Sequence, residues 1–125
     1  KNKKEIELNE IDRDEFLEML RVIYSLGQKI TDGNVIFLLR LGDRFQIKVV
    51  LDMVEDYLVS SAVPSLASKL LLSDHFRLIK LQDRCLNRLM SLQEVKGLKE
   101  TPEYRELSET TKVALLERMF QLVED

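Results

Sequence analysis

The fold is constrained most by three consecutive segments between residues 14 and 58 that each carry a stripe of apolar side chains and are joined by very short links. Within each segment the apolar residues recur every three or four positions, which is the spacing of one face of an α-helix. We therefore predict packed helices in this part of the chain. The first stripe consists of Phe16, Leu20, Ile23 and Tyr24, and the second of Val35, Leu38, Leu39 and Phe45.

Capping and breaking residues place the ends of these helices. Asp12, with Glu15 three residues later, resembles a capping box and predicts a helix start. Gly27 is expected to break this helix, and Thr31 is a good N-cap for the next one. Before them, the alternating segment EIEL at residues 5–8 predicts one short strand. The predicted helices cover about residues 12–24, 32–45 and 48–59.

Residues 60–65 contain Pro64 and three serines, and they predict a boundary between two parts of the chain. Two helices are expected after it, at about 66–77 and 79–91, and Gly97 is expected to mark a break. Their apolar residues are Leu66, Leu70 and Leu71 in the first helix, and Leu81, Cys85 and Leu89 in the second.

The last predicted helix begins after Ser108 and runs to about residue 123. Just before it, Thr101 and Pro102 have the order of an N-cap followed by proline at the first helical position. The last helix has a helical stripe of its own, formed by Val113, Leu116, Phe120 and Val123. The pattern as a whole predicts a mostly α protein of six or seven helices with one short strand.

Composition excludes several classes of protein. The chain of 125 residues is 45% apolar, which is enough for a globular core. Its net charge of −3 lacks the clustered positive charge that nucleic-acid binding needs. No apolar run approaches the ~20 residues that span a bilayer. Cys85 is the single cysteine, so no intrachain disulfide forms, and we expect a cytoplasmic or nuclear protein.

The side chains that carry out catalysis are scarce. His75 is the one histidine, and its apolar neighbours in the sequence predict that it packs in or beside the core. Cys85 lies on an apolar stripe, and a thiol nucleophile would need a nearby histidine or a positive field to activate it. Acidic pairs such as Glu55 and Asp56 are adjacent in a helix and do not converge on one point. We therefore expect no enzyme activity, no cofactor and no metal site.

Four stretches together resemble a known family: FLEMLRVIY at 16–24, ITDGNV at 30–35, LLRLGDRFQI at 38–47 and VEDYL at 54–58. They are similar to the C-terminal half of a BTB/POZ domain, in particular that of MATH–BTB adaptors. Residues 61–125 resemble, more loosely, the helical extension that follows this domain. The resemblance divides the chain into 1–60 and 61–125. It departs from the family at Gly42, where alanine is usual, at Val54, where cysteine is common, and in the turn at 26–28.

The resemblance implies a protein-binding function. Similar BTB domains form homodimers and bind the N-terminal region of cullin-3, while an attached MATH domain captures a protein substrate for ubiquitination. By the same resemblance, strands and two helices of the domain would precede Lys1, the first residue of this chain. The chain is then expected to be part of a substrate-specific adaptor of a cullin-3 E3 ubiquitin ligase.

The resemblance also implies which residues contact cullin-3. The tyrosine that ends the first helix lies at the cullin-facing edge in the family, and the residues after it are its neighbours. The helix that follows the boundary resembles one that adds cullin contact, although plain packing explains most of its leucines equally well. The candidates for cullin contact are Tyr24, Ser25, Leu26, Lys29, Leu66 and Leu70.

Two other classes of protein remain open. A transcriptional regulator of the BTB type uses the same domain for dimer or co-repressor contact. A helical scaffold unrelated to BTB domains is favoured if residues 5–8 form no strand and the first helix packs in a simple bundle.

Overall fold

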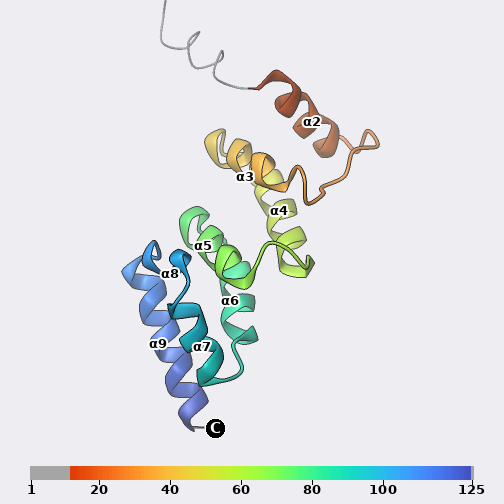
Figure 1. Cartoon of the computed structure of the whole chain (residues 1–125). Helices are drawn as coiled ribbons and strands as arrows, with labels where there is room; N and C mark the ends of the chain where they lie inside the picture. Colours follow the sequence, from red (N-terminus) through yellow and green to blue (C-terminus); the bar gives the residue numbers. More distant parts are fainter. Residues whose placement is uncertain (1–11, 125) are drawn as a thin grey trace, which may run out of the picture. The chain divides into compact units, whose positions relative to one another are not determined.

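The computed structural model describes residues 12–124, which fold into α-helices joined by short links (Figure 1). No strand occurs in this described part, so the prediction of a mostly α protein is confirmed there. The strand predicted at residues 5–8 lies outside the described residues. The helices are α2 (Arg13–Ile23), α3 (Val35–Arg44), α4 (Lys48–Ser60), α5 (Leu66–Phe76), α6 (Ile79–Arg88), α7 (Leu92–Lys99), α8 (Pro102–Arg105) and α9 (Glu109–Glu124).

The helices belong to two compact units, and each is described by itself. The first unit ends at Tyr57 and the second begins at Leu58, so the division falls inside α4. The predicted boundary at residues 60–65 lies a few residues further along, in the link between α4 and α5.

Helix starts follow the predicted caps. The Asp12 side chain accepts hydrogen bonds from the backbone N–H groups of Asp14 and Glu15, at 2.8 and 3.2 Å. The Thr31 hydroxyl accepts from the N–H groups of Gly33 and Asn34, but α3 begins only at Val35, about one turn later than predicted. These bonds satisfy backbone donors that a helix start leaves without a partner.

Three helices end in a left-handed residue that is not glycine. Ser25, Gln46 and Arg77 have φ angles of 56°, 54° and 59°, after α2, α3 and α5. In each case the following N–H bonds back to a carbonyl in the last turn of the helix; the bond from Leu26 to Arg21 measures 2.9 Å. This is the Schellman pattern, which usually contains glycine. Gly27, the predicted breaker, lies in the link beyond, and Ser25 makes the reversal.

The core of the first unit depends on a close approach of α3 and α4. Val35, Leu38 and Leu39 of the predicted second stripe are buried, as is Val50 of α4. A Cβ atom at Gly42 would lie 3.0 Å from a methyl group of Val50. Glycine lowers the stability of a helix when it lies inside it, but here its missing side chain lets α4 approach the backbone of α3 closely.

The second unit buries the predicted apolar residues of α5 and α6. Leu70, Leu81, Cys85 and Leu89 are almost fully inaccessible to solvent. Lys69 is also buried, and its ammonium group donates to the carbonyl of Ser61. A buried charge needs such a partner, because its lost hydration is otherwise not replaced.

The prediction of a break at Gly97 is wrong, because this glycine lies inside α7. Ser91 caps the helix by accepting from the N–H of Glu94 at 3.1 Å, and the Glu94 carboxylate accepts from the N–H of Met90 at 2.6 Å. Serine followed three residues later by glutamate is a signature of a helix start. This capping signature was present in the sequence, and it stabilises the helix enough to offset the cost of one glycine inside it.

The apolar stripe predicted for the last helix faces solvent. Helix α9 begins after Ser108, as predicted, and contacts α6 and α7. Its buried residues are Thr111 and Leu115, which lie on another side of the helix. The stripe of Val113, Leu116, Phe120 and Val123 is exposed.

A polar cluster fixes the N-terminus of α9 to α5. The Asp74 carboxylate accepts from the N–H and hydroxyl of Ser108, at 2.8 and 2.6 Å, and from the hydroxyl of Thr111 at 2.7 Å. Gln82 of α6 donates to the same Thr111 hydroxyl at 2.9 Å. Burial alone would raise the pKa of Asp74, but these hydrogen bonds hold that pKa below its usual value.

Candidate protein-binding surface

The link between α2 and α3 carries exposed side chains at the end of α2. Tyr24 closes the helix, and its N–H donates to the carbonyl of Leu20 at 3.0 Å. The left-handed Ser25 then turns the chain outward. As a result the side chains of Tyr24 and Leu26 are each 68% exposed. Two large side chains on either side of Ser25 are thus held in water by a defined backbone turn.

Polar side chains hold this link against α2. Asn34 is buried, and its amide nitrogen donates to the Glu18 carboxylate at 2.8 Å and to the Lys29 carbonyl at 2.9 Å. Its amide oxygen accepts from the N–H of Thr31 at 2.8 Å, and Gln28 donates to Glu18 at 3.1 Å. The link is therefore fixed in place, because hydrogen bonds to a charged group are the stronger kind.

Glu18 and Asn34 were missed by the sequence reasoning. Glu18 lies on α2 among apolar residues, and its role depends on Asn34, which is 16 positions away. The one signal for Asn34 was its place in the turn TDGN ahead of a helix, where asparagine commonly bonds to nearby backbone. The contact itself depends on how α2 and the link fold together.

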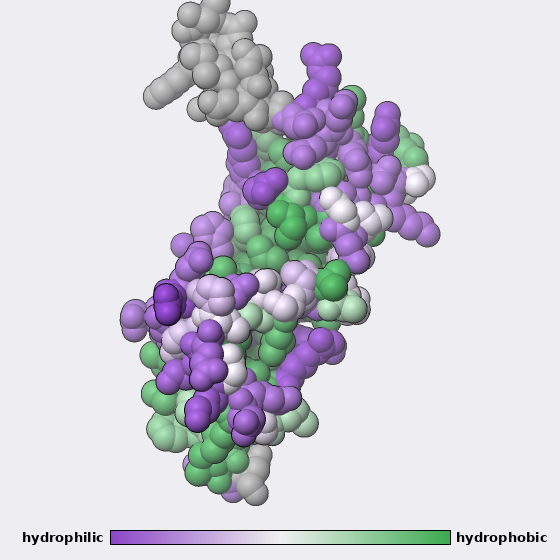
Figure 2. Space-filling view, viewed as in Figure 1, coloured by the Kyte–Doolittle hydropathy of each residue, from purple (hydrophilic) through white to green (hydrophobic). Residues whose placement is uncertain are grey.

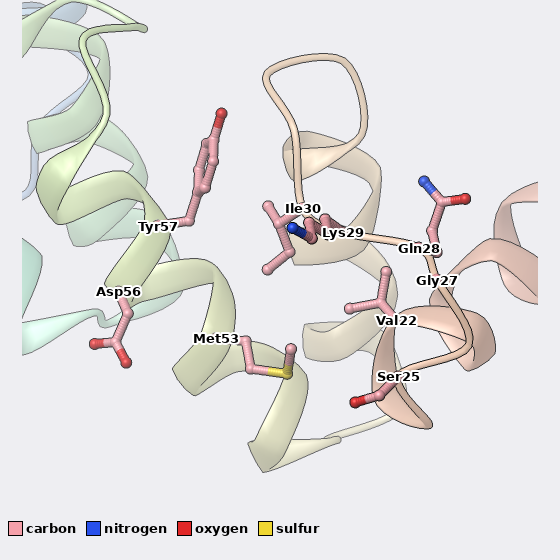
Figure 3. Close-up of a pocket in the computed structure, with 9 residues that line it drawn as sticks. All are labelled: Val22, Ser25, Gly27, Gln28, Lys29, Ile30, Met53, Asp56 and Tyr57. Atoms are coloured by element: carbon pink, nitrogen blue, oxygen red, sulfur yellow. The ribbon is translucent and has the colours of Figure 1, made fainter.

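An open groove of about 620 Å³ lies between this link and α4 (Figure 3). Figure 3 shows Met53 extending from α4 toward Val22 and Ser25. Lys29 and Asp56 add one charge of each sign to a largely apolar lining. The complete lining is Val22, Ser25, Gly27, Gln28, Lys29, Ile30, Met53, Asp56 and Tyr57.

Tyr57 of α4 contacts the turn that precedes α3. Its hydroxyl donates a hydrogen bond to the carboxylate of Asp32. That hydrogen bond is the main reason why the pKa of Tyr57 is raised, since ionisation of the phenol would lose the bond next to a negative charge. Tyr57 stays protonated at neutral pH, so this wall of the groove carries a neutral ring.

The structure brings together four of the six predicted contact residues. Ser25 and Lys29 line the groove, and Tyr24 and Leu26 belong to the same link. Leu66 and Leu70 lie on α5 in the second unit, where Leu66 is half-buried and Leu70 fully buried. For Leu70, packing in the core of the second unit is a simpler explanation than contact with a partner. The role of all six in partner binding stays a prediction.

Cys85 and His75 are the two side chains with the greatest potential for catalysis, and their surroundings differ. Burial raises the pKa of the Cys85 thiol to about 11, although Lys69 and Arg88 act in the opposite direction, so the thiol is protonated at neutral pH. His75 is exposed, which corrects the prediction that it packs in or beside the core. Its ring contacts that of Phe76 edge-on, with 4.8 Å between the ring centroids.

Among residues 12–124, no group of three or more potential ligands is placed to hold a metal ion. In the same range, no helix has the length and apolarity needed to cross a membrane.

Comparison with known families and proteins agrees with the resemblance seen in the sequence. The model of the BTB/POZ domain matches residues 1–62. The chain is 41% identical over 123 residues to BTB and MATH domain-containing protein 38 of Caenorhabditis elegans, covering 98% of this chain and 32% of that protein. It is 35% identical over 125 residues to protein 36 of the same name and organism, covering 100% of this chain and 39% of the relative.

A third relative, BTB and MATH domain-containing protein 39 of Caenorhabditis briggsae, is 32% identical over 118 residues. That alignment covers 94% of this chain and 35% of the relative. The chain thus spans about a third of the length of the curated relatives it matches. The search of solved structures found no match.

Proposed function

Because residues 1–62 belong to the BTB/POZ domain family, we propose that this chain is part of a substrate-specific adaptor that recruits proteins to a cullin-3 E3 ubiquitin ligase. In this proposal the N-terminal region of cullin-3 binds the link between α2 and α3. The BTB part also self-associates, and a separate domain of the same protein captures the substrate. The names of the relatives, which combine BTB with MATH, support this division of roles.

The observation that carries the proposal is the exposure of Tyr24 and Leu26 at the end of α2. A large apolar side chain that is held in water has no stabilising role in its own chain, whereas aromatic residues are common among those that dominate binding energy at interfaces. Tyr24 combines a ring that can bury apolar area in an interface with a hydroxyl that can stay hydrated at the edge of that interface.

The groove next to this link supports the same proposal. Its apolar lining includes Val22, Ile30 and Met53, and the charges of Lys29 and Asp56 fix how a partner with opposite charges is oriented. Because Asn34 and Glu18 hold the link in place, little conformational entropy is lost when a partner binds.

The test is a titration of the protein, at its natural full length, with the N-terminal region of cullin-3. Replacing Tyr24 by alanine removes one of the two large exposed side chains at the end of α2. We expect a loss of about 1 to 3 kcal/mol in binding free energy, which is roughly 5- to 150-fold in Kd. Thermal stability should change little, since the ring is exposed. Tyr24→Phe, which keeps the ring, should bind nearly as well as the natural protein.

The control variant must be an exposed residue without hydrogen bonds to the link. Glu18→Ala is unsuitable, because Glu18 accepts from both Gln28 and Asn34. Val49→Ala, on an exposed side of α4 and outside the groove lining, removes apolar area elsewhere in the same unit. If Tyr24→Ala loses no more affinity than Val49→Ala, the link is not the cullin-binding surface.

A further inference from the structure

Helix α9 is apolar on two sides. Its inner side contains the buried Leu115 and the half-buried Leu122. The opposite side presents four apolar side chains that are 48 to 65% exposed, called the outer stripe below. Figure 2 shows hydrophobic residues along the part of the surface where Figure 1 draws α9. The outer stripe consists of Val113, Leu116, Phe120 and Val123.

The spacing of the outer stripe is that of a helix-pairing seam. Its residues follow one another at intervals of three, four and three positions. This spacing assigns Val113 and Phe120 to the a positions of a heptad, and Leu116 and Val123 to its d positions. A single row of apolar residues at a and d is the narrow face that one helix presents to another helix.

The charges that flank the outer stripe indicate which helix fits it. Lys112 holds the g position before the seam, and Glu117 holds the following e position. In a parallel pair of identical helices, g of one chain lies opposite the next e of its partner, so lysine meets glutamate on both sides. In an antiparallel pair, e positions face each other, and Glu117 would lie near its own counterpart. The charge pattern therefore favours a second copy in parallel orientation.

We propose that the outer stripe of α9 binds the outer stripe of a second copy of this chain, with the two helices parallel and in register. The contact is isologous, with the same patch used by both copies around a two-fold axis. It lies entirely within the second unit and does not depend on the cullin proposal. It gives the chain a self-association surface in addition to the one expected of the BTB part.

One residue acts against the pairing. Glu109, at the first position of α9, occupies the d position one heptad before Leu116 and would face its counterpart. The pairing is consequently weak at this end, and Glu109→Ala should strengthen it. Lys112 also lies 5.1 Å from the ring of Tyr104 in its own chain. Changes at Lys112 therefore need thermal unfolding as a parallel measurement.

Site-specific cross-linking tests the contact without interference from association elsewhere in the chain. In the parallel pair each Leu116 faces its counterpart, so Leu116→Cys should form a covalent dimer under copper–phenanthroline oxidation. Gln121→Cys places the thiol on α9 outside the seam and is the matched control. The native Cys85 is buried, so the unchanged chain gives the baseline. We expect the Leu116→Cys dimer to form at least about tenfold faster than the control dimer, as it does when a contact holds two thiols together.

Two results would overturn the proposal. Equal rates for the two cysteine variants would mean that the outer stripe does not face a second copy. Faster cross-linking between a Leu116→Cys chain and a Phe120→Cys chain than between two Leu116→Cys chains would indicate an antiparallel pair, against the orientation proposed here.

Charge reversal provides a second, independent measurement. Lys112→Glu and Glu117→Lys should each slow Leu116→Cys cross-linking, because both place like charges across the seam. The chain with both substitutions restores opposite charges and should recover most of the natural rate. No recovery, with unchanged thermal unfolding, would contradict the parallel pairing.

Discussion

Helices α3 and α9 both have apolar residues at helical spacing, yet the second stripe has three of its four predicted residues buried, with Phe45 exposed, whereas the stripe of α9 has none buried. In α3, Val35, Leu38 and Leu39 are packed inside the first unit. In α9, Leu116 and Phe120 belong to a stripe of the same kind and lie in solvent. Hydrophobic periodicity therefore identifies a helix and its faces, but not what each face contacts.

The difference comes from the number of apolar faces on each helix. In α9 a second set of apolar residues competes with the stripe for the interior. Two polar anchors decide the rotation of the helix: Thr111 bonds to Asp74 at 2.7 Å, and Arg118 donates to the Leu89 carbonyl at 3.0 Å. Residues one turn away from these anchors, such as Leu115, are consequently carried inward. Hydrogen bonds of a few kcal/mol at most suffice when two faces have similar hydrophobicity.

The largest expected effect separates the two helices directly. Leu38→Ala should cost about 2 to 5 kcal/mol of unfolding free energy, because it leaves a cavity in a fully buried position. Leu116→Ala makes the same chemical change at an exposed position and should cost less than about 1 kcal/mol. Urea unfolding of both variants, at a concentration where the chain does not self-associate, measures the difference. Similar losses would show that the outer stripe is buried within one chain.

The next effect concerns the anchor of α9. Asp74→Asn removes the charge that holds Ser108 and Thr111, and should cost about 1 to 2 kcal/mol at neutral pH, since the bonds are partly exposed to water. Because the pKa of Asp74 is lowered in the folded chain, its contribution is present above the pKa of the unfolded chain, near 3.8. The contribution is lost as pH falls through the lower pKa of the folded state.

Urea unfolding between pH 7 and pH 3 measures this dependence. The difference between Asp74→Asn and the natural chain should be constant down to about pH 4 and shrink below it. Asp83→Asn, at an exposed position of α6, is the matched control. A difference that persists unchanged at the lowest pH would mean that the charge of Asp74 does not anchor the helix.

The smallest expected effect lies in α3. Helix propensity alone predicts that Gly42→Ala stabilises the chain by about 1 kcal/mol. We expect this gain to be cancelled, because the new methyl group would lie 3.0 Å from the buried and stiff Val50. Thermal unfolding should therefore show no increase in Tm. An increase would mean that α4 can move away from α3.

The candidate site shows the same limit of sequence reasoning on a smaller scale. The end of the first helix near Tyr24 could be predicted, and the family resemblance pointed to the link after it. The outward turn could not be placed, because Ser25 adopts the left-handed conformation and the nearest glycine, Gly27, lies two residues later. Serine is a poor predictor of that conformation, since the energy that favours it comes from the bonds of the last helical turn.

By itself the sequence determined the helices of the first unit, the cap at Asp12 and the start of α9, because capping and apolar spacing act between residues that are close along the chain. It also carried the resemblance to a BTB/POZ domain. Only the tertiary structure decided that Asn34 bonds to Glu18, that Gly42 admits Val50 and that the outer stripe of α9 stays in water. Each of these depends on which distant side chains meet, and the energies involved belong to the packed arrangement rather than to any one segment.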